Sequence, residues 1–158
     1  MQELINKATT LLEALPYIQR FAGATFVVKY GGSFMDSPDE AVRTGVASDV
    51  VFLEAVEINP VVVHGGGKRI NKALEEAGIK THFVNGLRYT DAASMEVVDR
   101  VLSREINAEI VAMIKSLGGM AKGIAGPEIF TCKKHAPYGE DYGFVGEVMS
   151  VNTTPLEE

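Results

Sequence analysis

The chain has 158 residues, enough for one domain, and 46% of them are hydrophobic, which suffices to bury a core. Its 15 lysines and arginines stand against 21 aspartates and glutamates, and the net charge of −6 argues against a nucleic-acid-binding protein, which presents a basic face. The single cysteine excludes an intrachain disulfide and favours a reducing, cytoplasmic compartment, and no apolar run approaches the roughly 20 residues of a membrane span.

The N-terminal segment, residues 1–20, is predicted to be an amphipathic helix, because leucines and isoleucines recur at helical spacing from Leu4 to Ile18. We expect Pro16 to kink or end this helix. The helix precedes the first strand of the core, and two interpretations stay open. Either it packs on its own domain, or it docks on another subunit.

Two short apolar runs, residues 24–30 and 60–64, predict buried strands. Each run ends in glycines, at residues 31–32 and 65–67, and a helical pattern follows each. The order strand, helix, strand, helix is a βαβ pattern. It predicts parallel strands joined by a right-handed crossover.

Turn and cap residues punctuate the helices that follow the strands. Ser37 is expected to cap the first helix in a capping box with Glu40, and Gly78 is expected to end the second. The dipeptide at residues 85–86, Asn-Gly, lies between two short β-prone runs and predicts a hairpin.

After Asp91 the sequence predicts a long helix. Its apolar stripe continues until the glycines at residues 118–119, which are expected to end it. Three strand-like pieces follow, at residues 122–125, 128–132 and 144–151.

The glycines mark a candidate anion site. In parallel α/β sheets, ligands bind beyond the carboxyl ends of the strands, and both glycine clusters occupy that edge. Glycine lets the backbone approach a ligand closely, and the second cluster leads into a helix whose N-terminus carries a partial positive charge. Two such turns after successive strands favour one anion held between them over glycines that merely form tight turns.

Lys29 and Arg88 are candidate cations. Lys29 stands near the end of a predicted buried strand, where desolvating a charge is costly, so we interpret it as a cation for transferred phosphate oxygens. The alternative is a lysine that extends to solvent. Tyr30 should point to the opposite face from Lys29. Arg88 follows the hairpin turn and can bind a carboxylate with two hydrogen bonds, or simply be solvated.

Other motifs are incomplete. Residues 65–69 lack the leading glycine and the Ser/Thr of a Walker A loop, and no dinucleotide-binding glycine fingerprint stands in the right place. Cys132 and His135 have a C-x-x-H spacing without a second ligand pair, so no metal site is predicted.

Three segments resemble the acetylglutamate kinases of the amino acid kinase family: VVKYGGS (residues 27–33), VVVHGGGKRIN (residues 61–71) and NGLRYTD (residues 85–91). The resemblance implies a three-layer α/β/α sandwich with a mainly parallel sheet. It assigns residues 1–20 to an N-terminal helix and residues 21–158 to an acetylglutamate-binding N-terminal lobe.

Members of this family phosphorylate the γ-carboxylate of N-acetyl-L-glutamate with Mg-ATP, in arginine biosynthesis. The roles that the resemblance implies are catalysis for Lys29, phosphate binding for Gly31 and Gly32, and substrate binding for Gly66, Gly67 and Arg88. It also implies a homo-oligomer, either a dimer or a hexamer joined through the N-terminal helix.

The sequence departs from the family at several points. Ser33 and Phe34 stand where the family often has Asn and Ala, and residues 126–128 replace a glycine-rich stretch. The lobe that binds most of the nucleotide has no counterpart, so we expect the chain to be inactive without a C-terminal half. Two alternatives stay open: a non-catalytic binding or oligomerisation module, and a sister kinase acting on aspartate, glutamate, carbamate or UMP.

Overall fold

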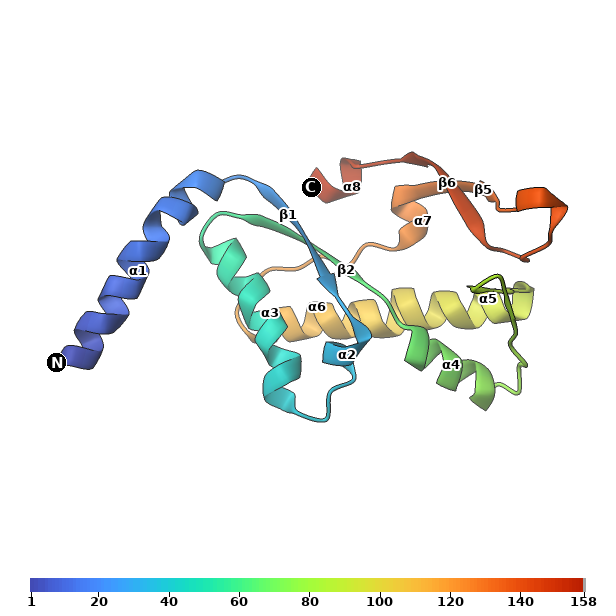
Figure 1. Cartoon of the computed structure of the whole chain (residues 1–158), viewed down its shortest axis with the longest axis horizontal. Helices are drawn as coiled ribbons and strands as arrows, with labels where there is room; N and C mark the ends of the chain where they lie inside the picture. Colours follow the sequence, from blue (N-terminus) through green and yellow to red (C-terminus); the bar gives the residue numbers. More distant parts are fainter. Residues whose placement is uncertain (158) are drawn as a thin grey trace.

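The computed structural model describes residues 1–157, except for the side chains of Ser33, Phe34 and Tyr138. It has the predicted α/β architecture, with helices packed on one face of a parallel pair of strands (Figure 1). The elements, in chain order, are α1 (Gln2–Phe21), β1 (Thr25–Tyr30), α2 (Gly32–Met35), α3 (Glu40–Ala55), β2 (Asn59–His64), α4 (Gly67–Glu76), β3 (Phe83–Val84), β4 (Leu87–Arg88), α5 (Ala92–Asp99), a π-helical segment (Arg100–Ile106), α6 (Asn107–Ser116), α7 (Gly126–Ile129), β5 (Phe130–Lys134), a 3-10 turn (Pro137–Gly139), β6 (Gly146–Val151) and α8 (Thr154–Glu157).

The parallel pair β1–β2 confirms the predicted βαβ unit. The strands are paired along their whole length, up to Tyr30 opposite His64, and α3 forms the crossover between them. Since both strands end at the same level, Gly31 and Gly65 follow as neighbours at the carboxyl edge of the sheet. Figure 1 shows α4 and α5 beyond this edge.

The two faces of the β1–β2 sheet differ in burial. Tyr30 is 3% exposed and faces the core, whereas Val27 is 71% and Val63 is 50% exposed on the opposite face. Lys29 pairs with Val63 and is exposed on that same face. The alternation confirms that Tyr30 and Lys29 point to opposite sides of the sheet.

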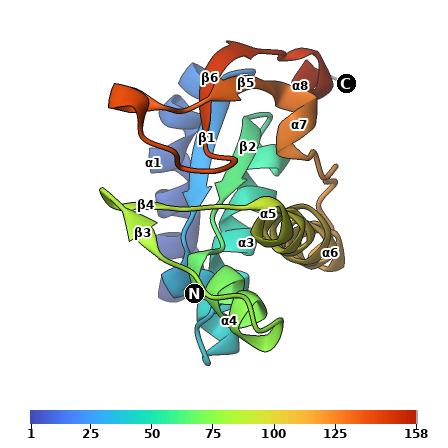
Figure 2. The ribbon, with the colours of Figure 1, turned by 90° about the vertical axis from the view of Figure 1, so that its right-hand side faces the viewer.

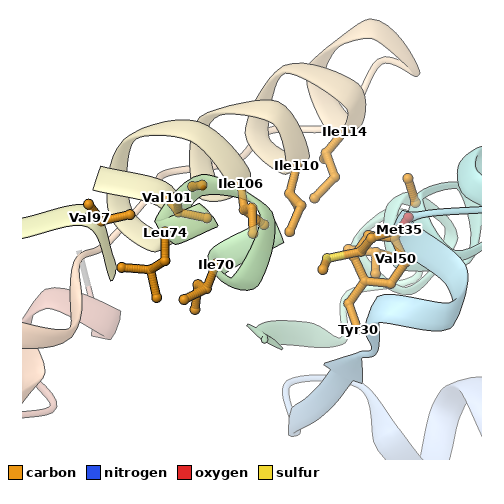
Figure 3. Close-up of a cluster of buried hydrophobic side chains, with 12 residues drawn as sticks. Tyr30, Met35, Val50, Ile70, Leu74, Val97, Val101, Ile106, Ile110 and Ile114 are labelled. Carbon is orange, nitrogen blue, oxygen red and sulfur yellow. The ribbon is translucent and has the colours of Figure 1, made fainter. Parts of the chain in front are cut away.

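The core lies between the covered face of the sheet, α3, α4 and the long helix that contains α5 and α6 (Figure 3). Leu74, Val101 and Ile106 are its most deeply buried side chains. Burying a side chain of this size contributes about 1.5–3 kcal/mol each. Met35 of α2 is also buried, so its packing in the core anchors the segment that follows the first glycine turn.

Helix α1 stands away from the core. None of its residues is buried, and Figure 1 shows it extending from the remainder of the chain. Of the kink or end expected at Pro16, the end is wrong, because the helix continues to Phe21 and closes with a hydrogen bond from the Ala22 N–H to the Ile18 carbonyl. A proline removes one intrahelical donor, and in an exposed helix water can satisfy the carbonyl left over. No helix within residues 1–157 is long and apolar enough to cross a membrane.

The cap predicted at Ser37 is formed two residues further along the chain. Asp39 is the N-cap of α3, and its carboxylate accepts a hydrogen bond from the Ala41 N–H at 2.9 Å. The Ser37 hydroxyl oxygen instead accepts from the Asp39 N–H at 3.2 Å, so it shapes the turn before the helix. Both residue types suit a cap, and the sequence does not tell which one adopts the cap geometry.

The predicted long helix is one helical run whose middle, Arg100–Ile106, has π-type hydrogen bonding. Its N-cap is Asp91, whose carboxylate accepts from the Ser94 N–H at 2.7 Å. This hydrogen bond lowers the pKa of Asp91. Beyond the helix, residues 122–125 form no strand, whereas β5 and β6 pair as an antiparallel hairpin.

The hairpin β3–β4 has the predicted Asn-Gly turn, with positive φ angles of 48° at Asn85 and 82° at Gly86. Its tip is tied to the segment before β6, because the Asn85 amide donates to Glu140 at 2.8 Å and to the Tyr142 hydroxyl at 3.0 Å. Figure 2 shows this hairpin beside the end of the sheet, above α4. The turn and its anchor together fix where Arg88, at the end of β4, lies.

Gly66 packs directly against the long helix, and this close approach generates a prediction. A Cβ at Gly66 would lie 2.7 Å from Cδ1 of Ile106 and 2.8 Å from Cδ2 of Leu102, whereas a Cβ at Gly67 meets nothing within 4 Å. We expect Gly66→Ala to lower the free energy of unfolding by about 1–3 kcal/mol through overpacking. Gly67→Ala is the matched control and should be neutral in urea denaturation. Equal stability of the two variants would contradict the close packing.

Candidate active site

The two glycine turns meet at the carboxyl edge of β1–β2. Gly31 connects β1 to the short helix α2, and Gly66 is the N-cap of α4. No side chain that the structure describes caps α4, so N–H groups of its first turn remain available at the edge where the two turns adjoin. An anion here gains those donors and the positive end of the α4 dipole. The structure therefore brings together the two turns that the sequence singled out.

Lys29 lies two residues before Gly31 of the first glycine turn, on the exposed face of the sheet. It makes no hydrogen bond or ion pair with the residues that the structure describes. The buried environment expected from the strand pattern is therefore wrong, because the face that carries Lys29 is uncovered. An uncommitted ammonium group near the turn can still approach an anion that binds at the edge.

Arg88 is not simply solvated. Its Nη2 donates a hydrogen bond to Oδ1 of Asn71, and its guanidinium lies over the Phe83 ring, 5.0 Å from the ring centroid. Its Nη1 is buried and has no hydrogen-bond partner among the described residues. A buried donor without a partner costs about 1–3 kcal/mol, so this nitrogen is suited to receive a ligand oxygen.

Asn71 connects Arg88 to the second glycine turn. Asn71 is four residues after Gly67 in α4, which corresponds to about 6 Å along the helix axis. The hairpin arginine is thus held beside the first turns of the helix whose N-terminus faces the strand edge. Gly67 and Arg88 are 21 residues apart in the sequence. The hydrogen bond between Arg88 and Asn71 nevertheless holds Arg88 beside α4, the helix that begins at Gly67.

Asp36, Arg69 and Glu109 form a charged network near the glycine turns that the sequence analysis did not predict. Arg69 of α4 donates from Nε to Asp36 at 3.1 Å and makes two hydrogen bonds to the carboxylate of Glu109 in α6. The hydrogen bonds to Glu109 and Asp36 raise the pKa of Arg69 above its usual range, with Glu109 the larger contributor. Burial raises the pKa of the neighbouring Tyr30, and Glu109 adds to the rise. This network ties the end of α2 to α4 and α6.

The hollow beside Asn71 and the search for metal-binding side chains add nothing to the candidate site. A hollow of about 440 Å³ borders Asn71, but its other lining residues include Glu75, Ile79 and Lys80 and none of the turn glycines 31–32 and 65–67, so it is not the site described above. Within residues 1–157, no group of three His, Cys, Asp or Glu side chains could hold a metal ion.

Comparison with known proteins relates this chain to one family. The model of the amino acid kinase family matches residues 24–158. An acetylglutamate kinase from Geobacter sulfurreducens is 47% identical over 163 residues, which cover 96% of this chain and 55% of the relative. An acetylglutamate kinase from a Thermoanaerobacter species is 49% identical over 150 residues, 94% of this chain and 49% of the relative. The chain spans about half the length of the curated relatives it matches.

A solved structure supports the fold. The crystal structure of N-acetylglutamate synthase from Neisseria gonorrhoeae, complexed with coenzyme A and L-arginine, matches with a TM-score of 0.67 at 21% identity. The match covers 95% of this chain and 36% of the synthase. At this identity the likeness bears on the fold alone.

The Arg69 network predicts a measurable loss of stability. Arg69→Met keeps the aliphatic length of the side chain and removes its bonds to Asp36 and Glu109. We expect the free energy of unfolding to fall on the order of 1 kcal/mol, since the groups remain partly in contact with water. Lys72→Met, which removes an exposed pair with Glu76 from the same helix, is the control and should change nothing measurable. Equal urea midpoints for both variants would mean that the network contributes no stability.

Proposed function

Because the chain belongs to the amino acid kinase family, we propose that it is the acetylglutamate-binding part of an acetylglutamate kinase, acting in arginine biosynthesis. Relatives of that name, 47% and 49% identical over nearly the whole chain, support the proposal. The observation that carries it is the buried, unpartnered Nη1 of Arg88, held beside the N-terminal turns of α4. A carboxylate-bearing substrate supplies the acceptor that this nitrogen lacks.

In the proposed reaction, an oxygen of the γ-carboxylate attacks the terminal phosphorus of ATP. The bond between that phosphorus and the β–γ bridging oxygen breaks, ADP leaves, and an acyl phosphate forms. No covalent bond to the protein is needed, because positioning and charge neutralisation supply most of the catalysis in such transfers.

Each candidate residue has a proposed role in that transfer. Arg88 binds the α-carboxylate, and the backbone of Gly66 and Gly67 contacts the remainder of acetylglutamate. Gly31 and Gly32 offer N–H groups to the transferred phosphoryl group, and Lys29 neutralises its developing charge. We also propose that Mg-ATP is bound mostly by a C-terminal half.

The length of the relatives supports the proposal of a C-terminal half, since the chain spans about half of each. Residues 1–158 by themselves would then bind acetylglutamate without turning it over. We also propose a cytoplasmic location, as for other biosynthetic kinases.

Helix α1 supports a further proposal, that the chain forms homo-oligomers. Leu4, Leu11, Leu12 and Tyr17 are each at least 65% exposed. An apolar stripe that finds no partner in its own domain is suited to pack against another copy. A dimer and a hexamer are both compatible with such packing.

The role of Lys29 predicts a particular kinetic defect. In the native protein that carries this sequence, Lys29→Ala should lower kcat by about 100-fold or more, the usual size for losing one preorganised charge donor. The Michaelis constant for acetylglutamate should change little, since charge develops only in the transition state. Lys115→Ala, at the end of α6, is the control for loss of a surface lysine. An unchanged kcat with a raised Michaelis constant would remove the catalytic role.

The role of α1 is tested by removing residues 1–20. None of the residues of α1 is buried, so the shortened chain should keep the circular dichroism and the unfolding midpoint of the core. Light scattering should show a smaller assembly than that of the intact chain. An unfolded product would instead mean that α1 stabilises its own domain, and an unchanged assembly would place the interface elsewhere.

A further inference from the structure

Arg88 is held from two sides before any ligand is present. The Phe83 ring covers one face of its guanidinium, and Asn71 accepts a hydrogen bond from one edge. Phe83 belongs to β3 and pairs directly with Arg88 in the hairpin, whereas Asn71 comes from α4. Two separate elements therefore determine the plane and the direction of this guanidinium.

We propose that Asn71 is a positioning residue, which orients Arg88 for the α-carboxylate of the substrate; this assignment rests on the proposed function. An arginine side chain that is free in solution loses rotamer freedom when it is fixed, and this loss opposes binding. Asn71 and Phe83 bring about that ordering before the ligand arrives. Binding of acetylglutamate therefore need not order Arg88, and its affinity is higher than it would be for a freely rotating arginine.

The hydrogen bond to Asn71 leaves other donors of Arg88 unused. Each terminal nitrogen of a guanidinium carries two N–H groups. The bond to Asn71 uses one N–H of Nη2, so the second N–H of Nη2 and both N–H groups of Nη1 stay without a partner among the described residues. The buried, unpartnered Nη1 is where a ligand acceptor is required.

The chemistry of the amide matters as much as its position. The Asn71 oxygen is a neutral acceptor, so it orients the guanidinium without neutralising its charge. A carboxylate at the same place would form an ion pair with Arg88 and repel the carboxylate of the ligand. The Asp36–Arg69–Glu109 network shows the contrasting arrangement, in which two carboxylates accept hydrogen bonds from all three guanidinium nitrogens of an arginine. Arg69 is thereby a structural cation, whereas Arg88 keeps its charge for a ligand.

The inference predicts an effect that depends on the α-carboxylate. NMR titration of the 158-residue chain with N-acetyl-L-glutamate and with 4-acetamidobutanoate, which lacks that carboxylate, separates the two contributions. Asn71→Ala should weaken binding of N-acetyl-L-glutamate roughly tenfold, the size expected for losing support of one charged hydrogen bond. Binding of 4-acetamidobutanoate should be unchanged. Asn71→Asp should weaken N-acetyl-L-glutamate further, and the control Lys72→Ala should alter neither ligand.

A second readout separates positioning from direct contact. The side-chain ¹H–¹⁵N signals of Arg88, assigned by their loss in Arg88→Ala, report how freely the guanidinium rotates. Asn71→Ala should accelerate that rotation in the absence of any ligand. Equal weakening of both ligands, or unchanged Arg88 rotation, would overturn the positioning role while leaving the proposed function intact. Failure of the parent chain to bind N-acetyl-L-glutamate would remove the proposed function, and this inference with it.

Discussion

The in-register parallel pairing of β1 with β2 is the constraint on which the site depends. It aligns Tyr30 with His64, so the glycines that follow each strand become neighbours. Tyr30 then fixes the end of β1, because its buried ring packs in the core and its hydroxyl donates to the Arg43 carbonyl at 3.0 Å. A shift of one residue would turn Tyr30 outward and separate the two turns.

The cations near this edge divide into two kinds. Arg69 is bound by Asp36 and Glu109 and holds α2, α4 and α6 together. Arg88 is bound only in part, and Lys29 has no partner among the described residues. Charges already paired within the protein hold its elements together, and charges left unpaired are the ones available to the anions that we propose bind here.

Local sequence signals predicted the parts of the fold that local physics determines. The Asn85–Gly86 hairpin and the stop at Gly78 follow from positive φ angles that few residues other than glycine and asparagine adopt. The contacts of Arg69 and Asn71 were missed, because each joins residues distant in the sequence. The exposure of Lys29 was also missed, since an apolar strand does not indicate which of its faces another element covers.

The most direct test of the account is a crystal structure of the chain with bound N-acetyl-L-glutamate. The account predicts one α-carboxylate oxygen within hydrogen-bonding distance of Nη1 of Arg88, with the Asn71–Arg88 bond preserved and the γ-carboxylate directed toward the turn at Gly31 and Gly32. A ligand bound elsewhere, or one whose α-carboxylate leaves Nη1 of Arg88 without a partner, would contradict it.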